Sequence, residues 1–433
     1  MRKRTWRISV ELFLPLCVLV VALAVLRAGM SRVDFHGDEG RAIWLTRYFD
    51  LLFIRHDLAS PEWGDNYWTH DHPFLTPYVI GAWLSARGYD LHNVPPPYDW
   101  NMSAEENRRD GRVPDDALLA EARAPMVFIA ACAIVLLYLL GRVLGGAVAG
   151  LVAAALGVAS PLDQKFLIRA VSDAPLVFFL LLGLLLGVLG SRRGRGGGLP
   201  AGWAAALGLA LGLGLETKLT SLLSLVAILV WGALMAIMAA GRGGPERIRA
   251  AWAAGRGWGL ALLVALGVYV GSDPHLYPNP LLHTAHRFQQ RVEDTELQER
   301  VAPREVVSKL PDRVRYVVDG SLVKETASGS RGLPLEAALV SVGAAVLLAR
   351  SRRVWQRGGR IPAEGLVLLT ALVYFAGVSA GLFLGRPRYL VPTLLLGTLL
   401  SGVGLSATIR QLAGLGIFIK SREPVAQGTA PRA

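Results

Sequence analysis

Polar residues that could do chemistry stand in five short clusters, each near the end of a long apolar segment. The first cluster follows the first apolar segment and reads Asp34-Phe-His36-Gly-Asp38-Glu39. A water-facing carboxylate here can serve as a general base or bind a metal. Asp38 can equally be the N-cap of the next helix, with Glu39 complementing the dipole of that helix. The residue types alone leave both interpretations open.

The second cluster reads Tyr67-Trp-Thr-His70-Asp71-His72-Pro73, and Pro73 suits the first turn of a following helix. Two histidines that flank an aspartate can bind a metal, but their i, i+2 spacing is a weak ligand signature. Solvated polar residues are the favoured interpretation of this cluster.

The third and fourth clusters are Arg169 with Asp173, and Glu216-Thr-Lys218. Arg169 and Asp173 are four residues apart and can simply pair on a helix. Alternatively, Arg169 binds a phosphate, and Asp173 binds a metal or an acceptor hydroxyl. Lys218 stands at a helix end, where a lysine often only extends its amine towards water.

The fifth cluster, Gly385-Arg386-Pro-Arg388-Tyr389, precedes the last apolar segment. A solvated turn is its plain explanation, but two arginines on the outer side oppose the usual charge trend and can capture an anion. His275, in the second large loop, is a further candidate for a metal or acceptor contact.

The apolar segments that must position these clusters call for a membrane. Hydrophobic residues make up 53% of the chain and charged residues only 18%, below the roughly 25% of soluble domains. The runs 124–140, 174–190, 219–240 and 337–349 contain no charged residue. Helices that are apolar on every side need a lipid solvent, and roughly 20 apolar residues cross a bilayer. A soluble multidomain protein is therefore excluded.

We predict an all-α polytopic membrane protein with about ten transmembrane helices. The expected spans are 8–28, 124–141, 145–160, 174–190, 200–216, 218–240, 257–272, 333–349, 365–384 and 389–409. Segments 40–58 and 73–86 are expected to lie as two interfacial helices in the first outer loop. The second of them is short for a crossing, and counting it as a span would invert everything after it. A polar, Pro-rich insertion at 88–122 follows.

The distribution of charge sets the expected orientation. With the N-terminus inside, the inner segments hold 21 Lys+Arg against 3 Asp+Glu, whereas loop 29–123 has 9 basic and 16 acidic residues. Loop 273–332 has 9 of each. Because cytoplasmic loops carry the basic excess, both large loops should face outside. The net charge of +12 therefore reflects membrane topology rather than nucleic-acid binding.

The expected organisation is one transmembrane domain, 1–410, with outer loops 29–123 and 273–332, and a cytoplasmic tail, 411–433. The basic start followed by an apolar run, without a clear cleavage site, predicts a retained signal anchor. Cys17 and Cys132 both lie in apolar runs, which leaves no disulfide framework and no cysteine metal cluster.

The order of the clusters resembles the GT-C superfamily of membrane glycosyltransferases, in the branch of protein O-mannosyltransferases and lipid A aminoarabinose transferases. The resemblance covers roughly residues 8–400 by motif order. Its motifs are Gly37-Asp38-Glu39, His72-Pro73, Arg169-x-x-x-Asp173-Ala-Pro, Gly214-Leu-Glu-Thr-Lys218 and Arg388-Tyr389-Leu-x-Pro392. Departures from the family are Phe74, where a second proline is common, and the insertion 88–122.

This resemblance implies transfer of a sugar from a polyprenyl-phosphate donor to an acceptor hydroxyl of a lipid, glycan or protein. The reaction would take place at the outer face of a bacterial inner membrane. The family's catalytic carboxylate maps onto Asp38, with Glu39 beside it. The implied roles of the other residues are donor-phosphate binding for Lys218, Arg169 and Arg388, and acceptor or metal contacts for His72, Asp173 and His275. A divalent cation, Mg²⁺ or Mn²⁺, is compatible with this chemistry.

The rival interpretation is a transporter or lipid flippase. Transporters usually place ionisable groups near the bilayer midplane, often on broken helices. Here the middles of the expected spans are nearly free of charge, and the polar clusters gather at one face. A membrane scaffold without catalysis would not need acids and phosphate-type cations together. An interfacial enzyme is favoured.

Overall fold

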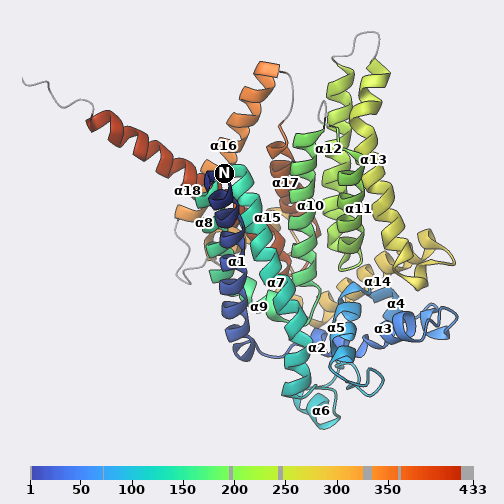
Figure 1. Cartoon of the computed structure of the whole chain (residues 1–433). Coiled ribbons are helices and arrows are strands. Elements are labelled where there is room, and N and C mark those ends of the chain that lie inside the picture. The colour runs from blue at the N-terminus through green and yellow to red at the C-terminus, as the bar shows by residue number, and fades with distance from the viewer. Residues whose placement is uncertain are drawn as a thin grey trace, which may run out of the picture.

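The computed structural model describes residues 2–71, 73–194, 198–241, 247–324, 334–358 and 362–420. Long helices run side by side as a bundle, and short helices cover one end of it (Figure 1). The N-terminus lies at the opposite end (Figure 1). The two large loops thus share one end of the bundle, as the charge pattern predicts. Which end faces the cytoplasm stays a prediction.

Each of the ten expected spans coincides with a helix. The long helices are α1 (Arg2–Gly29), α7 (Asp116–Gly145), α8 (Ala147–Ala159), α10 (Asp173–Arg193), α11 (Ala201–Leu215), α12 (Leu222–Ala240), α13 (Arg247–Gly271), α16 (Pro334–Gly358), α17 (Glu364–Gly381) and α18 (Val391–Lys420). Within the described residues, 7 helices are long and apolar enough to cross a membrane. The number rises to 8 if α8 and the short α9 (Pro161–Ile168), bent by 70°, form one span. The polytopic α-helical membrane architecture is confirmed, and the count of ten is not.

Small residues let the long helices approach closely. Gly212 of α11 faces α13, where an added Cβ would come within 2.6 Å of Cβ of Val268. Gly141 of α7 similarly faces Gly150 of α8, whose Cα would lie 2.9 Å from such an atom. Because lipid tails are as apolar as leucine, membrane helices associate through such close packing rather than through hydrophobic burial. The glycine-rich spans are therefore the ones that interlock.

The first outer loop folds into short helices, as expected for 40–58 and 73–86. Its elements are α2 (Gly37–Trp44), α3 (Arg47–Phe49), the π-helical turn η2 (Asp50–Ile54), η3 (Pro61–Trp63), α4 (Tyr67–Asp71), α5 (Leu75–Ala86) and α6 (Ala104–Arg109). An aromatic cluster made by Tyr48, Trp63, Phe74 and Tyr78 holds α3, η3 and α5 together. The insertion 88–122 contributes α6 and the first turns of α7.

The second outer loop contains η7 (Pro274–Leu276), α14 (Pro280–Val301), η8 (Pro303–Glu305), α15 (Leu310–Val318) and η9 (Asp319–Lys324). The loop contacts the first one through Arg287 of α14, which donates to the backbone oxygen of Thr69 at 3.1 Å and is paired with Asp273. At the C-terminal side, η10 (Pro387–Leu390) leads into α18. Since α18 continues to Lys420, the expected boundary at 410 falls inside a helix; residues 421–433 lie outside the described residues.

Candidate active site

Asp38 occupies the second position of α2, and it is not the N-cap. His36 is the N-cap. Its ring Nδ1 accepts from the backbone N–H of Asp38 at 3.3 Å, and its backbone N–H donates to Glu39 Oε2 at 3.1 Å. The cap interpretation of Asp38 is therefore wrong. The Asp38 carboxylate instead pairs with Arg388 of η10 and lies 3.5 Å from the guanidinium of Arg41.

Four side chains from distant parts of the chain meet here, and we call them the charge cluster: Asp38, Asp173, Lys218 and Arg388. Lys218 Nζ donates to Asp173 Oδ1 at 2.8 Å, and Arg388 lies 3.7 Å from Asp173 Oδ2. Lys218 and Asp173 are 6% and 1% exposed. The structure thus joins the first, third, fourth and fifth clusters of the sequence into one site.

The surrounding cations decide the ionisation of Asp38. Burial by itself would raise the pKa of this carboxyl, but Arg388 and Arg41 outweigh burial and hold the pKa well below its usual range. Asp38 is therefore ionised at neutral pH. Nε of Arg388 and Nε of Arg169 are buried and have no hydrogen-bond partner among the described residues. Unsatisfied guanidinium donors of this kind suit an incoming anion.

Arg169 lies at the edge of this cluster. One of its terminal nitrogens donates to the backbone oxygen of Asp34 at 3.5 Å, and its guanidinium lies 5.5 Å from the centre of the Phe166 ring. The helical Arg169–Asp173 pair considered from the sequence does not form, because Arg169 is extended and Asp173 bonds Lys218.

Glu39, the neighbour of Asp38, has different surroundings. It is fully buried, and its two oxygens accept from Arg123 at 2.7 and 2.8 Å, while Oε1 also accepts from the Ala170 N–H at 2.8 Å. Arg123 additionally donates to the backbone oxygens of Met30 and Val33. This network ties the start of α2 to α1, α7 and the segment before α10. Sequence reasoning missed Arg123; the signal was a charged residue at the start of an apolar run.

One cavity reaches the charge cluster, and a second lies beside the residues that directly precede Asp38. The larger, about 530 Å³, has Lys218, Arg388 and Arg291 at its polar part and opens between α12, α14 and α17. Its apolar lining includes Leu176, Leu219, Leu223, Phe288, Val292, Val378, Leu382, Phe383 and Pro392. The smaller, about 350 Å³, is lined by residues next to Asp38 and by the insertion 88–122. These residues include His36, Gly37, Tyr98, Trp100 and Arg108.

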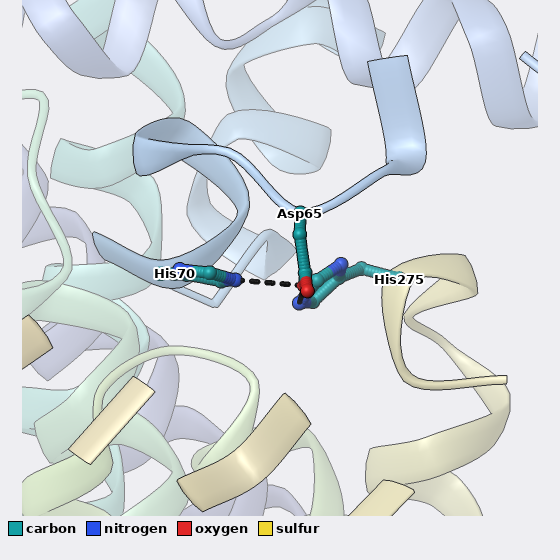
Figure 2. A group of neighbouring side chains, drawn as sticks. All are labelled: Asp65, His70 and His275. Carbon is teal, nitrogen blue, oxygen red and sulfur yellow. Dashed lines mark hydrogen bonds and ion pairs between the residues drawn. The ribbon is translucent and has the colours of Figure 1, made fainter. Parts of the chain in front are cut away.

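A second polar group, which we call the histidine cluster, consists of Asp65, His70, His275, His283 and His286. His70 Nε2 lies 3.0 Å from Asp65 Oδ1, within hydrogen-bond distance, and the nearest nitrogens of the other three rings lie 3.7 to 4.0 Å from the same carboxylate. Figure 2 shows Asp65, His70 and His275 converging from the two outer loops. Burial lowers the pKa of His275 to about 4.

The structure therefore separates the expected acceptor or metal contacts. Asp173 belongs to the charge cluster and His275 to the histidine cluster, while His72 lies outside the described residues. Sequence reasoning did not include Asp65, His283 or His286 in a site. Two signals were available: all eight histidines fall in the two large loops, and His283 and His286 are spaced i, i+3 on a helix.

A sequence-family model matches part of this chain. Residues 117–270, from α7 to α13, match the family model described as dolichyl-phosphate-mannose-protein mannosyltransferase. No curated protein sequence matches the chain.

Solved structures resemble nearly all of it. ArnT from Cupriavidus metallidurans, bound to undecaprenyl phosphate, has a TM-score of 0.52 at 16% identity, over 94% of this chain and 63% of ArnT. An Archaeoglobus fulgidus oligosaccharyltransferase, tethered to an acceptor peptide, has a TM-score of 0.54 at 14% identity. The match covers 93% of this chain and 50% of the oligosaccharyltransferase. The chain therefore shares its fold with these two proteins. This chain spans 63% and 50% of the length of these two proteins.

A third solved structure matches similarly. AglB from Archaeoglobus fulgidus, in complex with an inhibitory peptide and a dolichol-phosphate, has a TM-score of 0.50 at 13% identity, over 97% of this chain and 53% of AglB.

Proposed function

We propose that this protein is a glycosyltransferase that moves a sugar from a polyprenyl-phosphate donor to an acceptor hydroxyl at the extracytoplasmic face of a bacterial inner membrane. The observation that carries the proposal is the ion pair between Asp38 and Arg388, because Arg388 also lines the large cavity. A carboxylate that can accept a proton and a cation that can hold a phosphate therefore meet at one point.

The large cavity supports a lipid-phosphate donor. Lys218 and Arg388 offer positive charge at one part of it, and leucine, valine and phenylalanine side chains form much of the remaining wall. An apolar wall accommodates a prenyl chain, and the two cations hold its phosphate by charge-assisted hydrogen bonds. The structural relatives solved with undecaprenyl phosphate and dolichol-phosphate point to the same donor class. Arg169, with its unsatisfied Nε, adds a third cation.

Donor binding would also activate the carboxylate. Arg388 holds the pKa of Asp38 low, and a strongly acidic carboxyl is a weak base. A phosphate that competes for Arg388 would remove this stabilisation of the charged carboxylate and raise its pKa. Asp38 would thus become a better base when a donor is in place.

In the transfer step, Asp38 takes the proton from the acceptor hydroxyl while the hydroxyl oxygen bonds to the anomeric carbon. The bond between that carbon and the phosphate oxygen breaks, and the electron pair leaves with the polyprenyl phosphate. Lys218 and Arg388 stabilise the developing negative charge. Asp173 positions both cations through its contacts of 2.8 and 3.7 Å. Glu39 positions α2 through Arg123.

The smaller cavity is the proposed acceptor entrance. It is lined by His36 and Gly37, the residues that directly precede Asp38, shares no lining residue with the large cavity, and presents the rings of Tyr98 and Trp100. Trp100 is 63% exposed, and its ring is tilted by 59° against the ring of His36, with centroids 5.5 Å apart. Exposed aromatic faces next to polar groups suit the apolar face of a sugar or a peptide side chain. The insertion 88–122 therefore shapes the acceptor site.

A divalent cation was expected as an optional cofactor, with Mg²⁺ or Mn²⁺ as candidates. These hard ions prefer carboxylate and water oxygens, and Asp38 and Asp173 already bond Arg388 and Lys218. We therefore assign the neutralisation of phosphate charge to these side chains. Another structure of the Archaeoglobus fulgidus oligosaccharyltransferase, also 14% identical, was solved with Zn and sulfate.

The transporter alternative fits less well. The buried charged side chains of the described residues gather in the outer loops or in the helix ends next to them, for example Glu39, Arg123, Asp173, Lys218 and Arg287. A transport path needs polar groups near the midplane, where a substrate changes sides.

The direct test uses purified protein in lipid nanodiscs with a panel of labelled polyprenyl-phosphate sugars, each with water-soluble and lipid-linked acceptors. We expect labelled product with one donor and no label with the Asp38→Asn variant. Movement of intact donor between leaflets, without cleavage of its phosphate–sugar bond, would support the transporter instead.

A further inference from the structure

The histidine cluster lies outside the proposed catalytic machinery, and its composition is unusual for a loop contact. One carboxylate, from Asp65, faces four imidazole rings that come from both outer loops. Ligand atoms of Asp65, His70 and His275 all lie within 4.8 Å of one another. In a tetrahedral site with bonds of about 2.0 Å, ligand atoms are about 3.3 Å apart. Small side-chain rotations therefore suffice to bring these atoms around one ion.

Buried ring nitrogens without a hydrogen-bond partner are a second observation, independent of the distances between the side chains. Nε2 of His275, Nδ1 of His283 and Nδ1 of His286 are buried and have no hydrogen-bond partner among the described residues. Buried polar atoms are rarely left unsatisfied unless an ion, a water or a ligand binds them. A direct ion pair between Asp65 and His70 would give only these two side chains a partner. The nitrogens of His275, His283 and His286 would still lack one.

The tautomer of His275 is also set for ligation. Its Nδ1 lies 3.0 Å from the backbone oxygen of Trp63, and since a carbonyl oxygen can only accept, Nδ1 must carry the proton. Nε2 then has a free lone pair and faces Asp65 at 4.0 Å. A ring nitrogen that donates to a backbone carbonyl while the other binds the ion is the usual arrangement of metal-ligating histidines.

We propose that this cluster binds one Zn²⁺, with Asp65, His70 and His275 as three ligands and one of the α14 histidines, His283 or His286, as the fourth. Imidazole nitrogens with a single carboxylate suit zinc, whereas Mg²⁺ and Ca²⁺ take oxygen ligands. This inference goes beyond the proposed transfer reaction and does not rest on it.

The ion would cross-link the two large loops, because its ligands come from both of them. Asp65 lies between η3 and α4 and His70 lies on α4, both in the first large loop, whereas His275 of η7 belongs to the second (Figure 2). His283 and His286 lie on α14, also in the second loop. The next residues along α14, Phe288, Arg291 and Val292, line the large cavity. Zinc would therefore fix the position of one cavity wall.

Metal content tests the proposal directly. The full chain is purified through a tag without histidines, dialysed against metal-free buffer, and analysed by inductively coupled plasma mass spectrometry. We expect about one zinc per chain, and at least a tenfold lower zinc affinity, of the scale seen for disturbed zinc sites, in His275→Ala and Asp65→Asn. Asp65 is half exposed, so Asp65→Asn changes the carboxylate with little effect on packing.

The matched control is His92→Ala. His92 is also a loop histidine next to an aspartate, 2.8 Å from Asp50, but it lies outside the histidine cluster. It should keep the wild-type zinc content. Cobalt added to the zinc-free protein should give visible absorption bands in the wild type and in His92→Ala, but not in Asp65→Asn.

A structural readout completes the test. Zinc removal should increase hydrogen exchange in α14, and zinc should restore protection in the wild type but not in Asp65→Asn. A wild-type protein that neither contains nor takes up zinc overturns the proposal, as do equal zinc affinities in the wild type and both ligand variants. None of these results depends on glycosyl transfer, so they are separable from the proposed function.

Discussion

The charge cluster and the histidine cluster are both polar groups at the outer end of the same bundle, but their charges are balanced in opposite ways. In the charge cluster, Asp38 and Asp173 already have partners, whereas Nε of Arg388, and Nε of Arg169 at the edge of the cluster, have no hydrogen-bond partner among the described residues. In the histidine cluster, a single carboxylate faces buried ring nitrogens that have no hydrogen-bond partner among the described residues, and the free nitrogen of His275 carries a lone pair. The first has spare donors and the second spare acceptors.

This difference shows what each region can bind. Spare guanidinium donors in a partly buried site stabilise an anion such as a phosphate. Spare imidazole lone pairs stabilise a cation of intermediate softness. Residue type alone does not separate the two, because both regions contain aspartates and bases; the pairing of the atoms does.

The largest expected effect comes from Asp38→Asn, which tests whether the charge cluster is catalytic. We expect turnover to fall about 100-fold or more, the scale for loss of a general base. Arg388 keeps Asp173 as a partner, so expression and zinc content should be retained. The measurement is initial rate with saturating donor and acceptor. Near-normal turnover would move the catalytic role to another carboxylate.

Glu39→Gln is the neighbouring control for this variant. Since Glu39 neutralises buried Arg123, its loss should lower thermal stability in detergent, because removing one partner from a buried pair leaves an unpaired charge. The folded fraction of the Glu39→Gln protein should have a higher turnover number than the Asp38→Asn protein. A stable Glu39→Gln protein without activity would contradict a positioning role.

Removal of a donor-binding cation is expected to have the next largest effect. Arg388→Ala or Lys218→Ala removes a charge-assisted hydrogen bond worth about 1.5–3 kcal/mol, which corresponds to an increase of about 10- to 150-fold in donor KM. The control is Arg386→Ala, because Arg386 pairs with exposed Glu305 at 3.2 Å. If all three variants had the same donor KM, the phosphate would bind elsewhere.

The pH dependence of stability distinguishes the ion-paired carboxylate from a neutral one. The folded-state pKa of Asp38 is depressed, so its stabilising contribution is present above the unfolded pKa and is lost as the pH falls through the folded pKa. The difference in melting temperature between wild type and Asp38→Asn should be flat from about pH 5 to 8 and shrink below about pH 4. Thermal melts in buffered detergent measure it. A difference that changes between pH 6 and 8 would contradict the ion pair.

Trp100→Ala should have the smallest effect and concerns the acceptor side only. Loss of an aromatic contact worth about 0.5–1.5 kcal/mol should raise acceptor KM by about 2- to 12-fold. Donor KM and zinc content should stay at the wild-type values. Trp252→Ala is the control, because Trp252 is 69% exposed on α13 and lines neither cavity. An increase in donor KM instead would place the donor in the smaller cavity.

The sequence by itself determined the architecture, because hydrophobic length and charge bias act locally along the chain. Every expected span falls on a helix, and the two short helical segments before residue 87 form as α2–η2 and α5. Residues of four of the motif clusters meet in the charge cluster, although their order along the chain did not predict these contacts. A span needs only a run of side chains suited to lipid, and such a run can be read without knowing its neighbours.

Tertiary structure alone decided which polar atoms pair. Asp38 and Glu39 are adjacent in sequence, yet one meets Arg388, 350 residues away, and the other meets Arg123, 84 residues away. Asp65 carried no motif and became the centre of the histidine cluster only because α4, η7 and α14 fold against one another. Pairing depends on distances of a few ångströms between segments far apart in the chain, and local patterns contain no information on those distances.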